Sequence, residues 1–346
     1  MSIRSLILSC IDPPLTRPAA GAVLALGIWA SGAAAAMPAY SIAGTFGSPG
    51  GAWDVGPDGR LVALSGTSVL QQVAVNGSAY TNIGSVPAGT TASFGASFVS
   101  LSPDGSTLAI GDNVFAATGR VHMLNTAALN TSLPTPTVSV IAPNYAAAWS
   151  GSSTLYVSGG GGPTPTVTRI DGAASGSPAS TIVIDNIGDG SGGVAIRSGR
   201  LYTGIGFDTN FITDGTIRSF GLPSLSVAAA AVPFASGAFE AQILSASTLD
   251  FDALGNIIVG GFGSVAVVNL GTSERLDLAP NGPFGFYSGR YNAATGEILV
   301  TDFNVPGDVY RYAIPAPGMA TMMWLGGLLA WRRRRAGTFS CQECRS

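Results

Sequence analysis

The sequence predicts an all-β fold, a six-bladed β-propeller, and three observations lead to that prediction. A turn-centred segment recurs six times between residues 40 and 313. Each copy joins two β-rich runs through a tight turn, and a third run of alternating apolar and polar residues follows. The copies are spaced mostly by forty-odd residues, which is the length of a four-stranded propeller blade.

The repeats are clearest at their turns. The first two units share Pro-Asp-Gly, at residues 57–59 and 103–105, and Asp-Gly supplies the positive φ that a tight hairpin needs. The turn positions are 59, 105, 152, 199, 255 and 296, with spacings of 46, 47, 47, 56 and 41 residues. Even the longest spacing has no room for a seventh unit. A β-sandwich or a β-solenoid is the alternative fold, but neither explains this period.

The strands that follow the turns suggest how the ring closes. The third runs are 69–75, 120–124, 166–170, 216–220, 264–270 and 308–312, and the clearest fourth run is 80–86. The sixth unit lacks a fourth run, whereas the strand-like run from Tyr40 to Phe46 belongs to no unit. We therefore expect this run to be the outer strand of the sixth blade, where it covers an open edge.

The repeats resemble the six-bladed propellers of the NHL and gluconolactonase-like superfamily. The best match is residues 296–304 leading into 307–312, and the next is 108–113 leading into 119–121. The calcium-dependent lactonase branch implies a Glu, Asn and Asp set around the central tunnel. Of the three glutamates between residues 40 and 313, only Glu240 is expected to reach the tunnel mouth. We therefore predict no enzymatic activity, with a calcium-dependent lactonase or hydrolase as the alternative.

Acid–amide pairs recur in the loops between second and third strands, which share one face of a propeller. They are Asp112 with Asn113, Asp208 with Asn210, and Asp302 with Asn304. Because carboxylate and amide oxygens suit a cation or a polyhydroxy ligand, these residues form the predicted ligand-binding site. The alternative is that Asp and Asn stand there as good turn formers. No organic cofactor is predicted, and calcium is the metal that such oxygens would suit.

The remaining inventory excludes several classes of function. His122 is the only histidine, and no cysteine lies between residues 40 and 313. A Cys–His nucleophile pair, a His-rich metal site and a disulfide framework are therefore excluded from this body. The same segment has a net charge of −8, from nine arginines against seventeen carboxylates. Because such a surface repels phosphate, nucleic acid is not an expected partner.

Residues 1–36 have the pattern of a signal peptide. Arg4 and Arg17 precede a run of apolar or small residues from Ala19 to Ala36, and the run ends in an A-x-A-like segment. We expect cleavage near Ala36. The Sec translocon is the implied partner, and the propeller body, residues 40–313, is expected to be exported.

Residues 314–335 have the pattern of a sorting signal. A Pro-rich turn and an apolar stretch of 13 residues, 319–331, precede four arginines, and the stretch is shorter than the ~20 residues that a membrane-spanning helix needs. The turn and the basic cluster, which we expect on the cytoplasmic side, are Pro315, Ala316, Pro317, Gly318, Arg332, Arg333, Arg334 and Arg335.

This segment resembles the PEP-CTERM sorting domain, which exosortase-type membrane enzymes cleave near the proline motif. Two features differ from the family: Ala316 stands where its name implies Glu, and a short tail, residues 336–346, follows the arginines and contains Cys341 and Cys344. The resemblance implies an exosortase-like processing enzyme as a partner and a C-terminal hydrophobic sorting helix. A plain membrane anchor is the alternative.

Together these features predict an exported protein of the cell envelope or outer surface, transiently anchored through its C-terminus. We expect it to bind a surface polysaccharide or protein without catalysis, or to serve as a structural component of the matrix. The fold alone selects none of these roles, because propellers host many unrelated functions.

Overall fold

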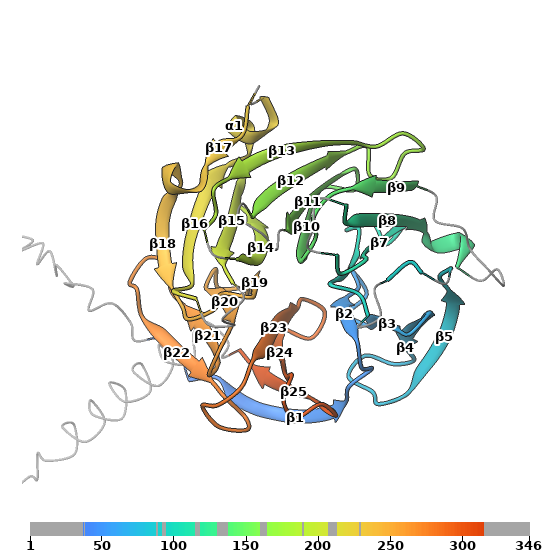
Figure 1. Ribbon diagram of the computed structural model, residues 1–346. Coiled ribbons are helices and arrows are strands. Elements are labelled where there is room, and N and C mark those ends of the chain that lie inside the picture. The colour runs from blue at the N-terminus through green and yellow to red at the C-terminus, as the bar shows by residue number, and fades with distance from the viewer. Residues whose placement is uncertain are drawn as a thin grey trace, which may run out of the picture. The chain divides into compact units, whose positions relative to one another are not determined.

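The computed structural model describes residues 37, 39–87, 89–91, 95–114, 118–129, 138–159, 165–188, 190–206, 213–227 and 230–314. In the body, six sheets surround a common axis (Figure 1), so the prediction of six blades is confirmed. The predicted signal peptide, sorting segment and C-terminal tail lie outside the described residues. Among the residues described, no helix is long and apolar enough to cross a membrane.

The first three blades follow one another along the chain, each numbered here from its innermost strand outward. Blade 1 contains β2 (Ala52–Val55), β3 (Leu61–Ser65), β4 (Ser68–Gln72) and β5 (Tyr80–Ser85). Blade 2 contains β6 (Val99–Leu101), β7 (Thr107–Gly111), β8 (Arg120–Asn125) and β9 (Val138–Ile141), with η1 (Thr126–Ala128) between the last two. Blade 3 contains β10 (Ala146–Ser150), β11 (Thr154–Gly159), β12 (Thr166–Asp171) and β13 (Ala179–Asp185).

The other three blades complete the ring. Blade 4 contains β14 (Ser191–Arg197), β15 (Arg200–Ile205), β16 (Thr216–Gly221) and β18 (Ala238–Gln242). Blade 5 contains β19 (Thr248–Phe251), β20 (Ile257–Gly260), β21 (Val265–Val268) and β22 (Arg275–Leu278). Blade 6 contains β23 (Tyr287–Asn292), β24 (Glu297–Asp302), β25 (Asp308–Ala313) and β1 (Ser41–Gly47). Every predicted third run is the third strand of its blade.

The predicted hairpin turns lie between the first and second strands of the blades. Five of the six predicted positions carry a glycine with positive φ. In the third unit the left-handed residue is Gly151, with a φ of 72°, rather than the expected position 152. The repeat was therefore placed correctly, with an error of one residue in its most divergent copy.

The N-terminal strand closes the ring as predicted. β1 pairs antiparallel with β25, from Ser41 opposite Ala313 to Gly47 opposite Asp308. Just before β1, the hydroxyl of the buried Tyr40 donates to Asp252 Oδ2 at 2.6 Å, and Asn256 Nδ2 donates to the Tyr40 oxygen at 2.9 Å. These bonds fasten the start of the closing strand to the first hairpin of blade 5.

An insertion explains the long spacing between the fourth and fifth turns. Between β16 and β18 the chain forms α1 (Leu222–Val227), β17 (Val232–Pro233) and η2 (Phe234–Ser236). β17 pairs parallel with β13, so the insertion of blade 4 adds a fifth strand to the sheet of blade 3. The extra length thus joins two neighbouring blades rather than forming a blade of its own.

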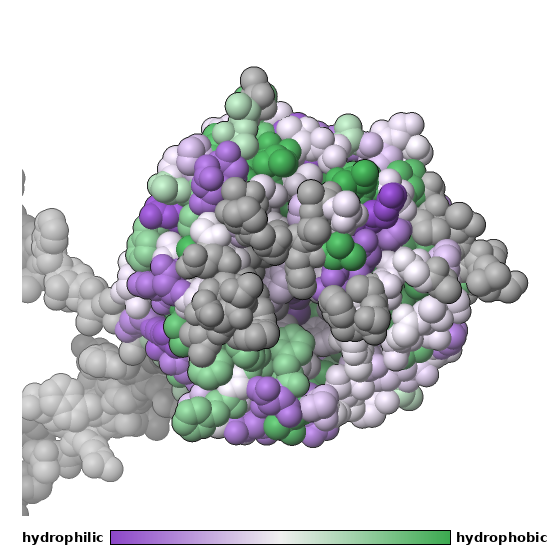
Figure 2. Space-filling model, viewed as in Figure 1, coloured by the Kyte–Doolittle hydropathy of each residue, from purple (hydrophilic) through white to green (hydrophobic). Residues whose placement is uncertain are grey.

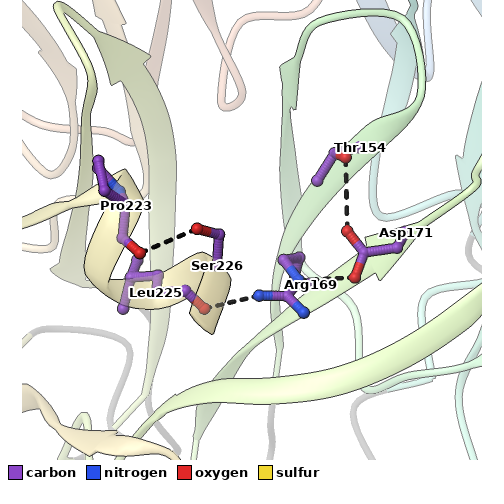
Figure 3. A network of polar contacts seen from close by, with 6 residues as sticks. All are labelled: Thr154, Arg169, Asp171, Pro223, Leu225 and Ser226. Carbon is purple, nitrogen blue, oxygen red and sulfur yellow. Dashed lines mark hydrogen bonds and ion pairs between the residues drawn. The ribbon is translucent and has the colours of Figure 1, made fainter. Parts of the chain in front are cut away.

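Arg169, on β12, also fastens this insertion to blade 3 (Figure 3). Its Nη1 donates to the carbonyl of Leu225 near the end of α1 at 2.6 Å, and its Nε forms an ion pair with Asp171 Oδ2 at 2.8 Å. Thr154 Oγ1 donates to the other oxygen of Asp171 at 3.4 Å. A cation suits this place because carbonyls at a helix C-terminus carry partial negative charge.

Each contact between neighbouring blades has its own apolar cluster. The clusters join blades 1 and 2, 2 and 3, 3 and 4, 4 and 5, 5 and 6, and 6 and 1. The cluster between blades 6 and 1 is the smallest, with only Phe46, Leu61, Leu299 and Val309 fully buried in it. The contact that closes the ring is therefore the one with the least apolar support.

The Tyr40 hydroxyl fastens the start of the closing strand to blade 5, and replacing it tests how much this contact stabilises the ring. We expect Tyr40→Phe to lower the free energy of unfolding by about 1–3 kcal/mol, because it leaves a buried carboxylate oxygen of Asp252 short of a donor. Urea denaturation of the body measures the change. Tyr310→Phe is the control, since the Tyr310 hydroxyl bonds Asn281 at the surface. Equal losses in the two variants would contradict the proposed role of Tyr40.

Candidate functional site

The connections of a propeller fall on two faces, because consecutive strands within a blade run in opposite directions. First-to-second and third-to-fourth connections lie on one face. Second-to-third connections and the links between blades lie on the other, which we call the loop face. The predicted acid–amide pairs belong to second-to-third connections, so they are expected on the loop face.

Asp112 uses its carboxylate to close its own loop. The side chain is buried, and Oδ1 accepts hydrogen bonds from the Val114 N–H at 3.1 Å and from Asn144 Nδ2 at 2.8 Å. Oδ2 accepts from the Arg120 N–H at 2.9 Å. The adjacent Asn113 adopts a left-handed conformation with a φ of 60°. This pair therefore performs the turn-forming role that the sequence offered as the alternative to ligand binding.

Asp302 does the same in blade 6. It is buried, and its Oδ1 accepts from the Asn304 N–H at 2.8 Å while its Oδ2 accepts from Asn281 Nδ2 at 3.2 Å. Asn304 itself is exposed, and its side-chain amide forms no hydrogen bond with a described residue. Asp208 and Asn210 lie outside the described residues. The binding role of the three pairs stays a prediction.

The described residues contain no group of three His, Cys, Asp or Glu side chains that could hold a metal ion. Glu240, expected near the tunnel mouth, lies instead on β18, the outermost strand of its blade, and accepts a hydrogen bond from Ser219 Oγ. The sequence interpretation was wrong here because the insertion shifts the fourth strand of this blade past residue 237. Glu297 begins β24 and pairs with Arg311 at 2.7 Å.

His122 is buried in the third strand of blade 2. It lies on β8, is 8% exposed, and its Nδ1 is 2.7 Å from Ser139 Oγ. Burial lowers the pKa of its imidazole below the ordinary value of 6.5, so the ring is neutral near pH 7.

The structure brings together three charged residues that sequence reasoning did not select. Asp54 on β2, Asp250 on β19 and Arg290 on β23 belong to innermost strands and occupy equivalent places in their hairpins. Asp54 pairs with Val62 and Asp250 with Ile258 on the second strand. A signal was present in the sequence for the two aspartates, because each is the only charged residue of a short first strand, Ala52–Val55 or Thr248–Phe251.

Each aspartate joins its blade to the next one. Asp54 Oδ2 accepts from the Leu101 N–H of blade 2 at 3.2 Å, and Asp250 Oδ2 accepts from the Tyr291 N–H of blade 6 at 2.7 Å. Arg290 Nη1 donates to the carbonyl of Leu249 in blade 5 at 2.9 Å. These side chains therefore connect the backbones of neighbouring inner strands.

The electrostatics of this group follow from its position at the inner wall. Burial raises the pKa of Asp54 and of Asp250 above the ordinary value of 3.8, and the positive charge of Arg290 opposes the change in both. Burial likewise raises the pKa of Tyr145, against the effect of a hydrogen bond with Ser247. Because backbone N–H groups of the next blade donate to the carboxylates of Asp54 and Asp250, these side chains link neighbouring blades.

The loop face of blades 5 and 6 carries an exposed apolar surface, which we call the phenylalanine surface. Phe284 is 83% exposed, Phe303 62%, Val305 52% and Leu244 42%. Phe262 and Phe286 complete it, with ring centroids 5.2 Å apart in an edge-to-face arrangement. Figure 2 shows apolar side chains gathered over these blades in the same view as Figure 1.

Backbone hydrogen bonds hold the loops of this surface together. The Gly263 N–H donates to the Gly285 carbonyl at 2.7 Å, and the Phe303 N–H donates to the Phe286 carbonyl at 2.9 Å. The Phe262 N–H donates to the Leu244 carbonyl at 3.1 Å. Gly285 is required where the loops meet, since a Cβ on it would lie 2.4 Å from Asn304 Nδ2. The phenylalanine side chains are thus exposed on loops whose backbones are joined by hydrogen bonds.

The connections that form the phenylalanine surface contain no charged residue, and the exposed Asp308 follows the last of them. The four connections, residues 243–247, 261–264, 279–286 and 303–307, contain no Asp, Glu, Lys, Arg or His. This is notable in a body with a net charge of −8. The sequence signal was a pair of uncharged turn segments rich in Phe, Pro and Gly, which pattern analysis alone assigns to ordinary loops.

No family model matches this chain, and no curated protein matches it. Among solved structures, the Cps50 (Swd1) β-propeller domain of Myceliophteria thermophila is similar over 80% of this chain and 100% of that chain, with a TM-score of 0.50 and 12% identity. This likeness shows the fold alone.

Two further structures are similar at a lower score. A chain of a mitotic checkpoint complex has a TM-score of 0.49 at 12% identity, over 80% of this chain and 96% of that chain. A gluconolactonase of Xanthomonas campestris has a TM-score of 0.49 at 13% identity, over 77% of this chain and 86% of that chain.

The raised pKa values of Asp54 and Asp250 predict how the free energy of unfolding depends on pH. A carboxyl group whose pKa is raised in the folded state costs stability once it ionises, so stability falls as pH rises from about 3.8 through the raised pKa. We expect the unfolding free energy of the wild type to fall over this range by on the order of 1 kcal/mol relative to the double variant Asp54→Asn/Asp250→Asn.

Urea denaturation at a series of pH values measures this difference. Asp58→Asn is the control, because Asp58 is an exposed aspartate paired with Arg60. Parallel pH profiles for the wild type and the double variant would contradict the assignment.

Proposed function

We propose that this protein is an exported, non-catalytic β-propeller that binds a partner at the cell surface or in its matrix through the phenylalanine surface. One observation carries the proposal: four connections of blades 5 and 6, joined by backbone hydrogen bonds, expose phenylalanine, valine and leucine side chains. Large exposed apolar patches mark interaction sites, because leaving such side chains in water has a free-energy cost without a structural benefit.

The placement of the chain ends supports presentation of this surface. Ser41 and Ala313 pair at one end of the closing strands, and Gly47 and Asp308 pair at the other. The connection 303–307 leads directly into Asp308, so the phenylalanine surface lies at that end. The body's first and last residues, Tyr40 and Ile314, therefore emerge on the opposite face. An anchor attached beyond Ile314 would leave the phenylalanine surface pointing away from the membrane.

Delivery to the outside is part of the proposal. Residues 1–36 would direct the chain to the Sec translocon, and residues 314–335 would hold it in the membrane until an exosortase-like enzyme cuts near Pro315–Pro317. The composition of the body supports an extracellular life, because it contains no cysteine that could be oxidised.

Binding can be tested by removing the apolar side chains. We expect Phe284→Ser/Phe303→Ser, in the full chain, to lower several-fold the fraction of protein retained on washed intact cells and to raise the fraction in the medium. Quantitative immunoblotting of both fractions measures the change.

Phe239→Ser is the matched control, because Phe239 is 60% exposed on the outer strand β18, away from the phenylalanine surface. Near-ultraviolet circular dichroism checks that each variant folds. Unchanged retention of the folded double variant would overturn the proposal.

Processing has its own test. In a host with an exosortase-type enzyme, we expect the C-terminal peptide of the exported protein to end near the proline motif at 315–317, whereas replacing Arg332–Arg335 by serine leaves residues 319–331 attached. Mass spectrometry of the C-terminal peptides distinguishes these products, and a host without the enzyme is the control. An intact C-terminus ending at Ser346 in the host with the enzyme would contradict the sorting assignment.

A further inference from the structure

We infer that the phenylalanine surface pairs two copies of this chain face to face about a two-fold axis. This inference rests on the proposed function and names the partner of its binding surface. Charge, exposure and the position of the body's ends support this pairing.

Charge selects where two copies can meet. With a body net charge of −8, two copies repel one another over most contacts. A two-fold contact is isologous, so the same patch is used on both copies and a charge near the axis lies close to its own copy. The connections 243–247, 261–264, 279–286 and 303–307 carry no charge at all. Their surface is therefore self-complementary in the electrostatic sense.

Exposure supplies the attraction. Phe284 and Phe303 are 83% and 62% exposed, so most of their apolar area is available for burial against a partner. Phenylalanine is enriched in the buried centres of protein interfaces, where edge-to-face ring contacts add to the transfer free energy. The hydrogen bonds between these loops mean that little conformational freedom remains to be lost when two copies meet.

The chain's own apolar stretch, residues 319–331, is the competing occupant. It follows Ile314, which lies at the opposite face, and four residues, 315–318, separate the two. Four residues span at most about 14 Å, whereas a six-residue strand such as β25 is about 20 Å long. The linker therefore leaves the start of that stretch short of the phenylalanine surface, and only the later residues of the stretch would reach that surface in the same molecule. A second copy does not face this limit.

Such a pair fixes where the ends of the two bodies lie. Tyr40 and Ile314 lie on the face opposite the contact in each copy. A face-to-face dimer therefore has its chain ends on its two outer faces, pointing in opposite directions. Copies anchored in two different surfaces could pair in this way, which would join those surfaces.

The first experiment is sedimentation velocity of residues 37–314 over a range of concentrations. This segment contains every strand and apolar cluster described above, including the closing strand, so it is a self-contained folding unit. We expect a reversible monomer–dimer equilibrium that high salt leaves intact, because no ion pair holds it. Phe284→Ser/Phe303→Ser should weaken the dimer at least tenfold, and Phe239→Ser should not change it.

A cross-linking experiment tests the arrangement independently of stability. The segment contains no cysteine, so Phe284→Cys introduces a single thiol at the centre of the proposed contact. We expect a covalent dimer under mild oxidation of Phe284→Cys, and none with Phe239→Cys.

A monomer at every concentration would overturn the inference, as would a dimer that survives Phe284→Ser/Phe303→Ser. If the wild-type body is monomeric while the double variant still loses cell-surface retention, self-pairing is wrong and the proposed binding role stands with another partner. Addition of a peptide with the sequence of residues 319–331 tests the competing occupant: dissociation of the dimer by that peptide would contradict pairing of two bodies as the preferred state.

Discussion

The pairing of β1 with β25 is the constraint on which this structure depends. A propeller is stable only when its last blade contacts its first, and here that contact has the smallest apolar cluster in the described part of the ring. Hydrogen bonds compensate: the buried Asn292 donates to the Gly59 carbonyl at 2.9 Å, and Asn76 donates to Glu297 at 3.0 Å. Because β1 comes from the other end of the chain, its place in the sixth sheet joins the first and last parts of the ring.

The inner wall follows from the same need to join blades. Asp54 and Asp250 accept hydrogen bonds from the next blade, and Arg290 donates to the previous one. These residues resemble an active-site group in their chemistry, with two carboxylates, a guanidinium and raised carboxyl pKa values. Their acceptors are nevertheless engaged by backbone N–H groups. Charged residues of the inner strands thus serve the contacts between blades.

The loops are the better place to look for function, because the strands hold the ends of each loop while the loop side chains can vary. The loop face of blades 5 and 6 combines hydrogen-bonded loops, exposed phenylalanine and connections without charged residues, and the body begins and ends on the other face, at Tyr40 and Ile314. The proposed function uses this arrangement to separate attachment from recognition. The insertion of blade 4 illustrates the same freedom: its extra segment contacts blade 3 through β17 and Arg169 without disturbing the inner strands.

The sequence by itself determined the all-β class, the six repeats, the hairpin turns and the closing role of the strand after Tyr40, because Asp-Gly turns and two-residue alternation are local signals. It also placed Asp112 in a loop, whereas Asp302, expected in a loop, is the last residue of β24. Only the tertiary structure decided what those carboxylates contact, moved Glu240 to an outer strand, and aligned Asp54, Asp250 and Arg290 along the inner wall. It alone assembled Phe284, Phe303 and Leu244 into one surface, because these residues are far apart in sequence and meet only when antiparallel strands bring separate loops to the same face.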